Sequence, residues 1–248
     1  QYIDTGSWST YAIKEAAKYG KVEVVASSQA DTYKHIPDLP ANWLDSEADY
    51  VHVTTNNTIY GTLWPELPDT GDVPLVADMS SNILSQPYDI EKFGLIYAGA
   101  QKNIGPSGLT LVIIREDLIG YAGPTVAKMM EYKTYADKNS MFNTPPTFAI
   151  YLANLVFEWL ENLGGIPAIH QRNLEKAGVL YDYLDQSEAF VPIVKKGDRS
   201  LMNVVFRMKN QGKEAGFLKT AEANQMYFLK GHRSVGGLRA SLYNAMPV

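Results

Sequence analysis

The chain contains no cysteine among its 248 residues, so neither a disulfide nor thiol catalysis is possible within it. It has no apolar run near the roughly 18 residues of a membrane-spanning helix, and its first residues show no signal-peptide pattern. The G-x-S-x-G motif of many serine hydrolases and the G-x-G-x-x-G motif of nicotinamide dehydrogenases are both absent. We therefore expect a soluble, cytoplasmic protein that belongs to neither of these enzyme classes.

The charge balance gives no sign of a polyanionic partner. The chain has 22 Lys and Arg against 27 Asp and Glu, a net charge of -5, so we expect no binding to nucleic acid or to an anionic membrane. Hydrophobic residues make up 46% of the chain, enough to bury the core of one large or two modest domains. His35, His52 and His170 show no metal-ligand spacing, and we assign no metal site.

Lys102 is the most informative single residue. It follows a short apolar run (95–97) and three small residues (98–100), which would bring a lysine side chain to the edge of a core. Partial burial favours the neutral amine, which can form a Schiff base with an aldehyde. The small residues leave room for a flat ligand beside the backbone. A solvated lysine at the end of a strand is the ordinary alternative.

Asp78 makes a merely solvated Lys102 less plausible. It ends another short apolar run (73–77), and a carboxylate at a strand end in an α/β protein faces the ligand crevice. Pyridoxal phosphate would need both groups, because its aldehyde requires an amine and its ring nitrogen requires an anion to stay protonated. Taken alone, Asp78 could equally be a helix cap or a turn residue.

Six blocks, in this order, give the chain a resemblance to the phosphoserine aminotransferases, pyridoxal-phosphate enzymes of the aspartate aminotransferase fold type. The blocks are 4–8 (DTGSW), 56–62 (NNTIYGT), 77–81 (ADMSS), 96–106 (IYAGAQKNIGP), 140–147 (SMFNTPPT) and 231–241 (GHRSVGGLRAS). The resemblance covers essentially the whole chain. It also implies that an N-terminal segment of the family, with part of the cofactor-phosphate site, and a short C-terminal tail are not represented here.

The resemblance implies a set of cofactor contacts. Lys102 and Asp78 would be the catalytic pair, Trp8 would stack on the pyridine ring, and Thr58 would donate to the ring oxygen. Neutral hydrogen bonds to the cofactor phosphate would come from Ser80, Gln101, Asn143 and Thr144. Each also has an ordinary interpretation: a core tryptophan, a turn threonine, or a cap of the helix that follows.

For Asn143 and Thr144, the resemblance implies contact with the cofactor phosphate of a neighbouring subunit, hence a homodimer with shared active sites. Arg239 would bind the substrate α-carboxylate, while His232 and Arg233 would face the substrate phosphate. A planar guanidinium suits a carboxylate, and a clustered His-Arg pair suits phosphate. Basic residues beside glycines are otherwise commonly solvated loop residues.

Strand and helix patterns alternate along most of the chain. Apolar strand patterns cover 22–25, 50–54, 73–77, 95–98 and 109–114, and helical patterns cover 9–19 and 147–163. The alternation favours an α/β fold with a mainly parallel sheet and helices on both faces, which the resemblance makes the fold type I of pyridoxal-phosphate transferases. In the second helix we expect the aromatic residues Phe148, Tyr151 and Trp159 to lie in the core. A smaller α+β domain follows, so we divide the chain into 1–168, a cofactor-binding domain, and 169–248.

The expected function is that of a phosphoserine transaminase. It would transfer the amino group of O-phospho-L-serine to 2-oxoglutarate, giving 3-phosphohydroxypyruvate and L-glutamate, and would catalyse the reverse reaction. The transfer would use a pyridoxal-phosphate Schiff base on Lys102. The resemblance places that reaction in serine biosynthesis and leaves open a related role in pyridoxine synthesis. Another fold type I enzyme, or an incomplete fragment without activity, are the alternatives. A cysteine desulfurase, a fold relative, is disfavoured because its mechanism needs a thiol.

Overall fold

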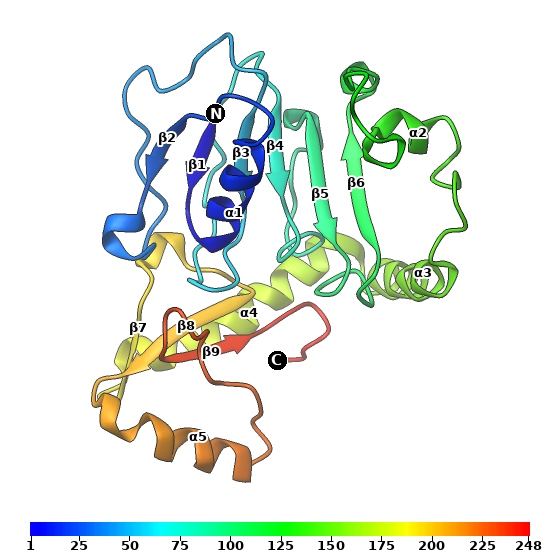
Figure 1. Cartoon of the computed structure of the whole chain (residues 1–248). Helices are drawn as coiled ribbons and strands as arrows, with labels where there is room; N and C mark the ends of the chain where they lie inside the picture. The colour runs from blue at the N-terminus through cyan, green and yellow to red at the C-terminus, as the bar shows by residue number, and fades with distance from the viewer.

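The computed structural model describes all residues, 1–248, as two sheets with their helices (Figure 1). The strands are β1 (Tyr2–Asp4), β2 (Val24–Ser27), β3 (Val51–Thr54), β4 (Leu75–Asp78), β5 (Leu95–Gly99), β6 (Thr110–Ile114), β7 (Phe190–Pro192), β8 (Asn203–Met208) and β9 (Leu238–Ser241). The α-helices are α1 (Ser7–Ala16), α2 (Tyr132–Ala136), α3 (Thr147–Asn162), α4 (Gly165–Gln186) and α5 (Glu214–Ala223). No helix has both the length and the apolar character required to cross a membrane.

The large sheet has the strand order β2-β1-β3-β4-β5-β6. Its first five strands are parallel, while β6 pairs antiparallel with β5. The connection from β5 to β6 spans only residues 100–109, which is too short for the crossover that a parallel pair requires. The expectation of a mainly parallel sheet in an α/β fold is confirmed.

Alternation along the parallel strands separates the two faces of the sheet. Val51, Val53, Leu75 and Ala77 lie on one face, in a fifteen-residue apolar core. The residues between them, such as His52, face the other side, because successive side chains of a strand point to opposite faces. A buried core on one face fixes the register of the strands, and therefore fixes which side chains reach the carboxyl edge of the sheet.

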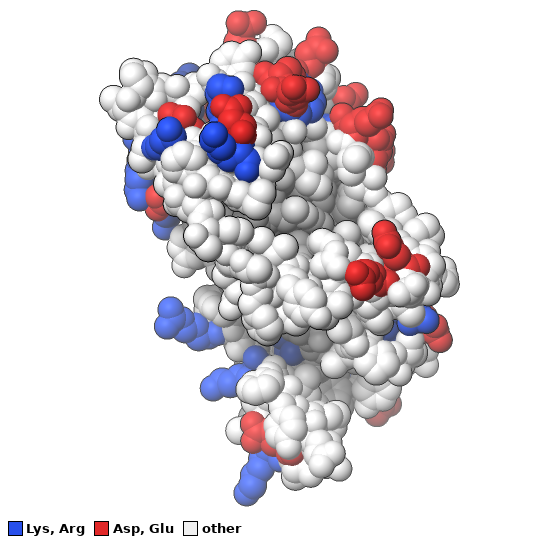
Figure 2. Space-filling view, turned by 90° about the vertical axis from the view of Figure 1, so that its right-hand side faces the viewer, with Lys and Arg blue, Asp and Glu red and all other residues white.

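The aromatic residues of α3 do not lie in the core, and that prediction was wrong. Phe148 is 72% exposed, Tyr151 57% and Trp159 37%. The helix packs instead through Ala149, Ala153 and Leu160, with Ala153 in the core beside Gly105 and Phe157 partly buried against that core. Helical spacing identifies residues that share a face, but it does not say which face the rest of the structure covers. Figure 2 shows this side of the molecule, with few charged groups in its middle.

The small sheet has the order β7-β8-β9, all antiparallel, and packs with α4 and α5 around a second apolar cluster. It lies below the large sheet in Figure 1, on the side toward which the arrowheads of β4 and β5 point. The expected division at residue 168 falls near the start of α4, and it stays a prediction.

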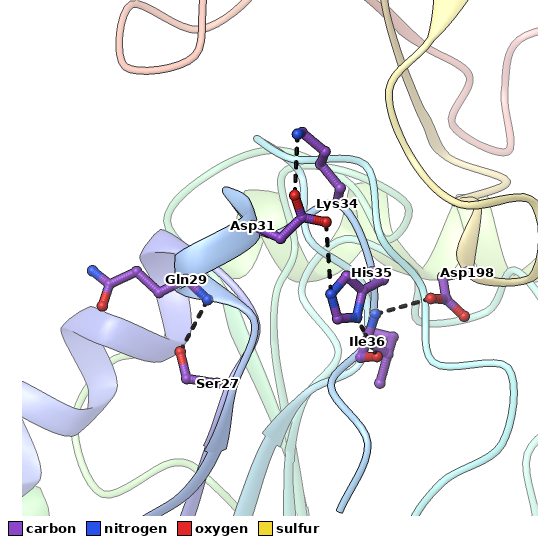
Figure 3. Close-up of polar contacts among 7 residues, drawn as sticks. All are labelled: Ser27, Gln29, Asp31, Lys34, His35, Ile36 and Asp198. Carbon is purple, nitrogen blue, oxygen red and sulfur yellow. Dashed lines mark hydrogen bonds and ion pairs between the residues drawn. The ribbon is translucent and has the colours of Figure 1, made fainter.

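The segment before β8 ties the two sheets together. Asp198 Oδ2 accepts from the Ile36 amide at 3.0 Å, and the Lys195 amide donates to the Lys34 carbonyl at 2.9 Å. His35 lies beside this contact, with its Nε2 3.7 Å from Asp31 Oδ2 (Figure 3). The small sheet is therefore anchored to loops that follow strands of the large one.

Candidate active site

A hollow of about 360 Å³, partly open to solvent, lies where the parallel strands β3, β4 and β5 end. Its lining comes from the residues that follow these strands and from the first turn of α1. The lining residues are Trp8, Thr54, Asn56, Thr58, Asp78, Ser80, Ser81, Gln101 and Lys102. Open α/β sheets bind ligands at this edge, outside the carboxyl ends of the strands.

Lys102 reaches this hollow from the turn after β5. Its Nζ donates to Thr58 Oγ1 at 2.8 Å. Burial lowers the pKa of the Lys102 amine below its usual value; the Asp78 carboxylate opposes this shift, and the Arg239 guanidinium adds to it. The larger neutral fraction makes the amine a better nucleophile near neutral pH.

Asp78 ends β4 on the same side of the hollow. Its Oδ1 accepts from the Ser80 amide at 2.9 Å, which holds the carboxylate at the strand end. Burial raises the pKa of Tyr97 on the neighbouring strand, and the nearby Asp78 charge adds to that effect. A neutral Tyr97 beside Asp78 leaves the carboxylate free to meet a cationic group in the hollow.

Arg239 comes from β9 of the small sheet and reaches the loop that follows β3. Its Nη1 donates to the Thr58 carbonyl at 3.1 Å. Its Nε is buried without a hydrogen-bond partner. Thr58 thus contacts both cations, Lys102 through its hydroxyl and Arg239 through its backbone. An unpaired buried guanidinium N–H is costly unless an anion meets it.

Ser80 and Gln101 converge on Gly99, the last residue of β5. Ser80 Oγ accepts from the Gly99 amide at 3.1 Å. The Gln101 side chain folds over the Gly99 α carbon, where a Cβ atom would lie 2.6 Å from Gln101 Oε1. Only glycine leaves space for this amide, so β5 ends in a compact polar corner of the hollow. Trp8, on the first turn of α1, lines the hollow and is 45% exposed as a residue.

Arg239 does not itself line this hollow but contacts Thr58, which does. Four other expected site residues lie away from the hollow. Asn143 and Thr144 are exposed in the segment between α2 and α3, where Asn143 Nδ2 contacts Met129 Sδ at 3.5 Å. His232 and Arg233 lie in the loop before β9, where His232 Nδ1 pairs with Ser234 Oγ at 2.7 Å. None of the four is among the residues that line the hollow.

Three lining residues were missed: Thr54, Asn56 and Ser81. Thr54 ends the strand pattern over 50–54 and Asn56 follows it, so their place at the end of a parallel strand was the available signal. Thr54 Oγ1 is buried without a hydrogen-bond partner. Asn56 and Ser81 are bonded to each other, with Asn56 Nδ2 donating to Ser81 Oγ at 2.8 Å.

These residues fit pyridoxal phosphate. A desolvated amine and a carboxylate from the neighbouring strand face one hollow, as the aldehyde and the ring nitrogen of the cofactor require. Thr54 Oγ1 and Arg239 Nε are buried polar atoms without a hydrogen-bond partner, so a bound ligand could satisfy them. Trp8 supplies a flat, half-exposed ring at the edge.

The fold and this site define a pyridoxal-phosphate-dependent aminotransferase. The model of the class-V aminotransferases matches residues 2–248, and the chain belongs to that family and, within it, to the phosphoserine aminotransferases. It is 53% identical over 247 residues to the phosphoserine aminotransferase of Bacillus cereus (strain ATCC 14579), covering 100% of this chain and 69% of that protein. The corresponding protein of Listeria monocytogenes serovar 1/2a is 55% identical over 249 residues, with 100% and 68% covered.

The solved structures agree with this assignment. Phosphoserine aminotransferase from Bacillus circulans subsp. alkalophilus superposes with a TM-score of 0.95 at 48% identity, over 99% of this chain and 68% of that one. The pyridoxal-phosphate-bound enzyme from Trichomonas vaginalis gives 0.89 at 38% identity, over 99% and 71%. The resemblance read from the six blocks is confirmed.

Proposed function

We propose that this chain carries out phosphoserine transamination. The amino group of O-phospho-L-serine passes to 2-oxoglutarate, giving 3-phosphohydroxypyruvate and L-glutamate, and the reaction also runs in reverse. The observation that carries the proposal is that Lys102 and Asp78 line one hollow, with the Arg239 guanidinium bonded to Thr58 of that lining and close enough to lower the pKa of Lys102. The relatives of the chain are named phosphoserine aminotransferases. An amine, an anion and a carboxylate receptor are the groups that an α-amino acid transaminase needs. The reaction would serve serine biosynthesis, and a related phosphorylated substrate would extend it to pyridoxine synthesis.

Lys102 has two tasks in this scheme. Its Nζ would hold the cofactor, and the same nitrogen, as a free neutral amine, would take the proton from the substrate α carbon. Pyridoxal phosphate, when bound, supplies a conjugated ring that accepts the electron pair left on that carbon. The lowered pKa of Lys102 suits both tasks, because each requires the neutral amine.

The remaining residues orient the reactants. Asp78, an anion that lines the hollow, would keep the ring nitrogen of the cofactor protonated. Arg239 receives the substrate carboxylate at its unpaired Nε, close enough to Lys102 to affect the pKa of the amine. Trp8 covers one side of the hollow and excludes water there. Ser80 and Gln101 supply neutral hydrogen bonds.

We further propose a homodimer in which Asn143, Thr144, His232 and Arg233 serve across the subunit boundary. The support is their placement outside the hollow of their own chain. The exposed aromatic residues of α3 offer an apolar face next to the segment that carries Asn143 and Thr144. Exposed patches of this kind mark interaction surfaces. A cytoplasmic location is proposed because multiply charged substrates do not cross a bilayer unaided.

The test is a single half-reaction. The purified chain is loaded with pyridoxal phosphate and mixed with phosphoserine, serine or alanine, and the loss of the visible absorbance band is followed along with the keto-acid product. The proposal expects conversion with phosphoserine at least about a hundredfold faster than with serine, since a doubly ionised phosphate makes several charge-assisted hydrogen bonds. Equal rates would indicate another fold type I enzyme. A band that no amino acid discharges would indicate an inactive fragment.

A further inference from the structure

A buried polar chain connects the small sheet to the hollow. Its centre is Asn203, the first residue of β8, which is fully buried. Asn203 Oδ1 accepts from Asn56 Nδ2 at 3.0 Å, and Asn203 Nδ2 donates to Tyr243 Oη at 3.1 Å. Both sides of this one amide are therefore satisfied by residues of two different segments, the loop after β3 and the strand end after β9.

Asn56 is held from three directions. Besides Asn203, its Nδ2 donates to Ser81 Oγ, and its Oδ1 accepts from Ser200 Oγ at 2.5 Å. Ser200 Oγ in turn accepts from the backbone N–H of Asn203 at 2.9 Å. A network in which every member is paired has one low-energy arrangement, because any displacement leaves a buried polar atom without a partner.

The same loop is clamped a second time, at Gly61. Gly61 has φ +83°, and a Cβ atom there would lie 2.8 Å from the Asn203 carbonyl oxygen. The Ser200 amide donates to the Gly61 carbonyl at 2.9 Å. Residues 56–61 therefore rest directly on the start of β8, and Thr58 lies in the middle of this stretch.

Thr58 is the residue that touches both Lys102 and Arg239. Arg239 lies on β9, whose register with β8 pairs Arg239 with Val205 and Ser241 with Asn203. Asn203 thus fixes the Thr58 loop against the same pair of strands that carries the guanidinium. The spacing between the amine and the guanidinium depends on this junction.

We propose that Asn203 is a positioning residue, which sets the separation between the amine of Lys102 and the carboxylate receptor Arg239 by holding the loop 56–61 on β8. This inference rests on the proposed function for the meaning of that separation. Asn203 does not line the hollow, so it acts through Asn56 and Thr58. The consequence is selectivity for amines that bear an α-carboxylate.

The experiment compares Asn203→Ala with Asn173→Ala. Asn173 is a matched control: it is also fully buried, and its side chain also makes two hydrogen bonds, with Nδ2 donating to the Ser85 carbonyl and to Asn244 Oδ1. It joins α4 to other segments without contacting the loop 56–61. The Tyr243→Phe variant provides a milder second test if Asn203→Ala fails to fold. It removes the hydroxyl that Asn203 Nδ2 meets, which also interacts with Thr58 of the same loop.

The first readout needs no cofactor. Hydrogen exchange, followed by mass spectrometry on the cofactor-free chain, is measured for peptides that cover residues 55–64. Asn203→Ala is expected to speed exchange there by about tenfold, the effect of one lost buried hydrogen bond. Tyr243→Phe shifts it in the same direction, while Asn173→Ala leaves it at the wild-type rate.

The second readout is the rate of discharge of the loaded protein by phosphoserine relative to phosphoethanolamine, which lacks the α-carboxylate. Asn203→Ala is expected to lower this ratio by about tenfold, because the carboxylate no longer meets Arg239 while the amine of either substrate can still displace Lys102. A general loss of stability would slow both reactions and leave the ratio unchanged.

Two results would overturn the inference: exchange in residues 55–64 that responds equally to both asparagine variants, or faster exchange in Asn203→Ala with an unchanged substrate ratio. If wild-type protein does not react with phosphoserine, the proposed function fails. The exchange measurement then still decides whether Asn203 holds the loop, so the two failures are distinguishable.

Discussion

Replacing Thr58 with Val removes one hydroxyl beside the reactive amine of Lys102 and so tests what that hydroxyl does to the pKa of the amine. The Lys102 amine donates to the Thr58 hydroxyl at 2.8 Å, and valine keeps the shape of the side chain without the acceptor. A hydrogen bond to a charged group is worth about 1.5–3 kcal/mol, against about 0.5–1.5 kcal/mol between neutral groups. The hydroxyl therefore favours the protonated amine by about 1 kcal/mol.

At 1.36 kcal/mol for each pKa unit, this difference corresponds to roughly 0.7 units. We expect the pKa of Lys102, already lowered by burial, to fall further in Thr58→Val. The amine of the cofactor-free variant is then more reactive at neutral pH than that of the wild type. The same substitution weakens cofactor binding, because the hydroxyl is also the expected donor to the ring oxygen.

The assay is acylation of the cofactor-free protein at a series of pH values, with the modified peptide that contains Lys102 quantified by mass spectrometry. Thr58→Ser, which keeps the hydroxyl, is the control and should titrate as the wild type does. A higher pKa in Thr58→Val than in Thr58→Ser would refute the reasoning, since it would mean that the hydroxyl stabilises the neutral amine.

Three further predictions concern the site and its support. Asp78→Asn should lower the rate of the half-reaction by at least about a hundredfold while Lys102 still forms the visible band, because the ring loses its anionic partner; an unchanged single-turnover rate would contradict this. Gly61→Ala should lower the free energy of unfolding by about 1–3 kcal/mol in urea titration, since its φ of +83° and the contact 2.8 Å from the Asn203 carbonyl oxygen both oppose a side chain. Burial lowers the pKa of His52 from 6.5 to about 4, so the unfolded chain binds a proton that the folded one excludes. Stability should therefore fall by about 3 kcal/mol between pH 6.5 and 4, and His52→Gln should flatten that part of the profile measured by denaturant titration.

The sequence was most informative where strand ends carry the chemistry. Asp78 ends one short apolar run and Lys102 follows shortly after another, and parallel strands bring such ends to one edge of the sheet. Their meeting in one hollow could thus be expected from the pattern alone. Trp8 and Thr58 needed the resemblance, because a tryptophan after a turn or a threonine in a polar loop has many ordinary roles.

Long-range packing was the part that periodicity could not supply. The spacing in α3 correctly placed Phe148, Tyr151 and Trp159 on one helix, yet the core is reached by Ala153 instead. Asn203 shows the same limit, since its proposed positioning role depends on a hydrogen bond with Asn56, 147 positions earlier in the chain. No local pattern marks a buried amide as a link between two sheets.

The most direct test of the central claim identifies the lysine that bonds the cofactor. The chain is incubated with pyridoxal phosphate, reduced with borohydride, digested and mapped by mass spectrometry, with Lys102→Ala as the control. The account predicts a single modified peptide that contains Lys102, and no visible absorbance band in the control. Modification spread over other lysines, or a band that persists in Lys102→Ala, would contradict the assignment of this site.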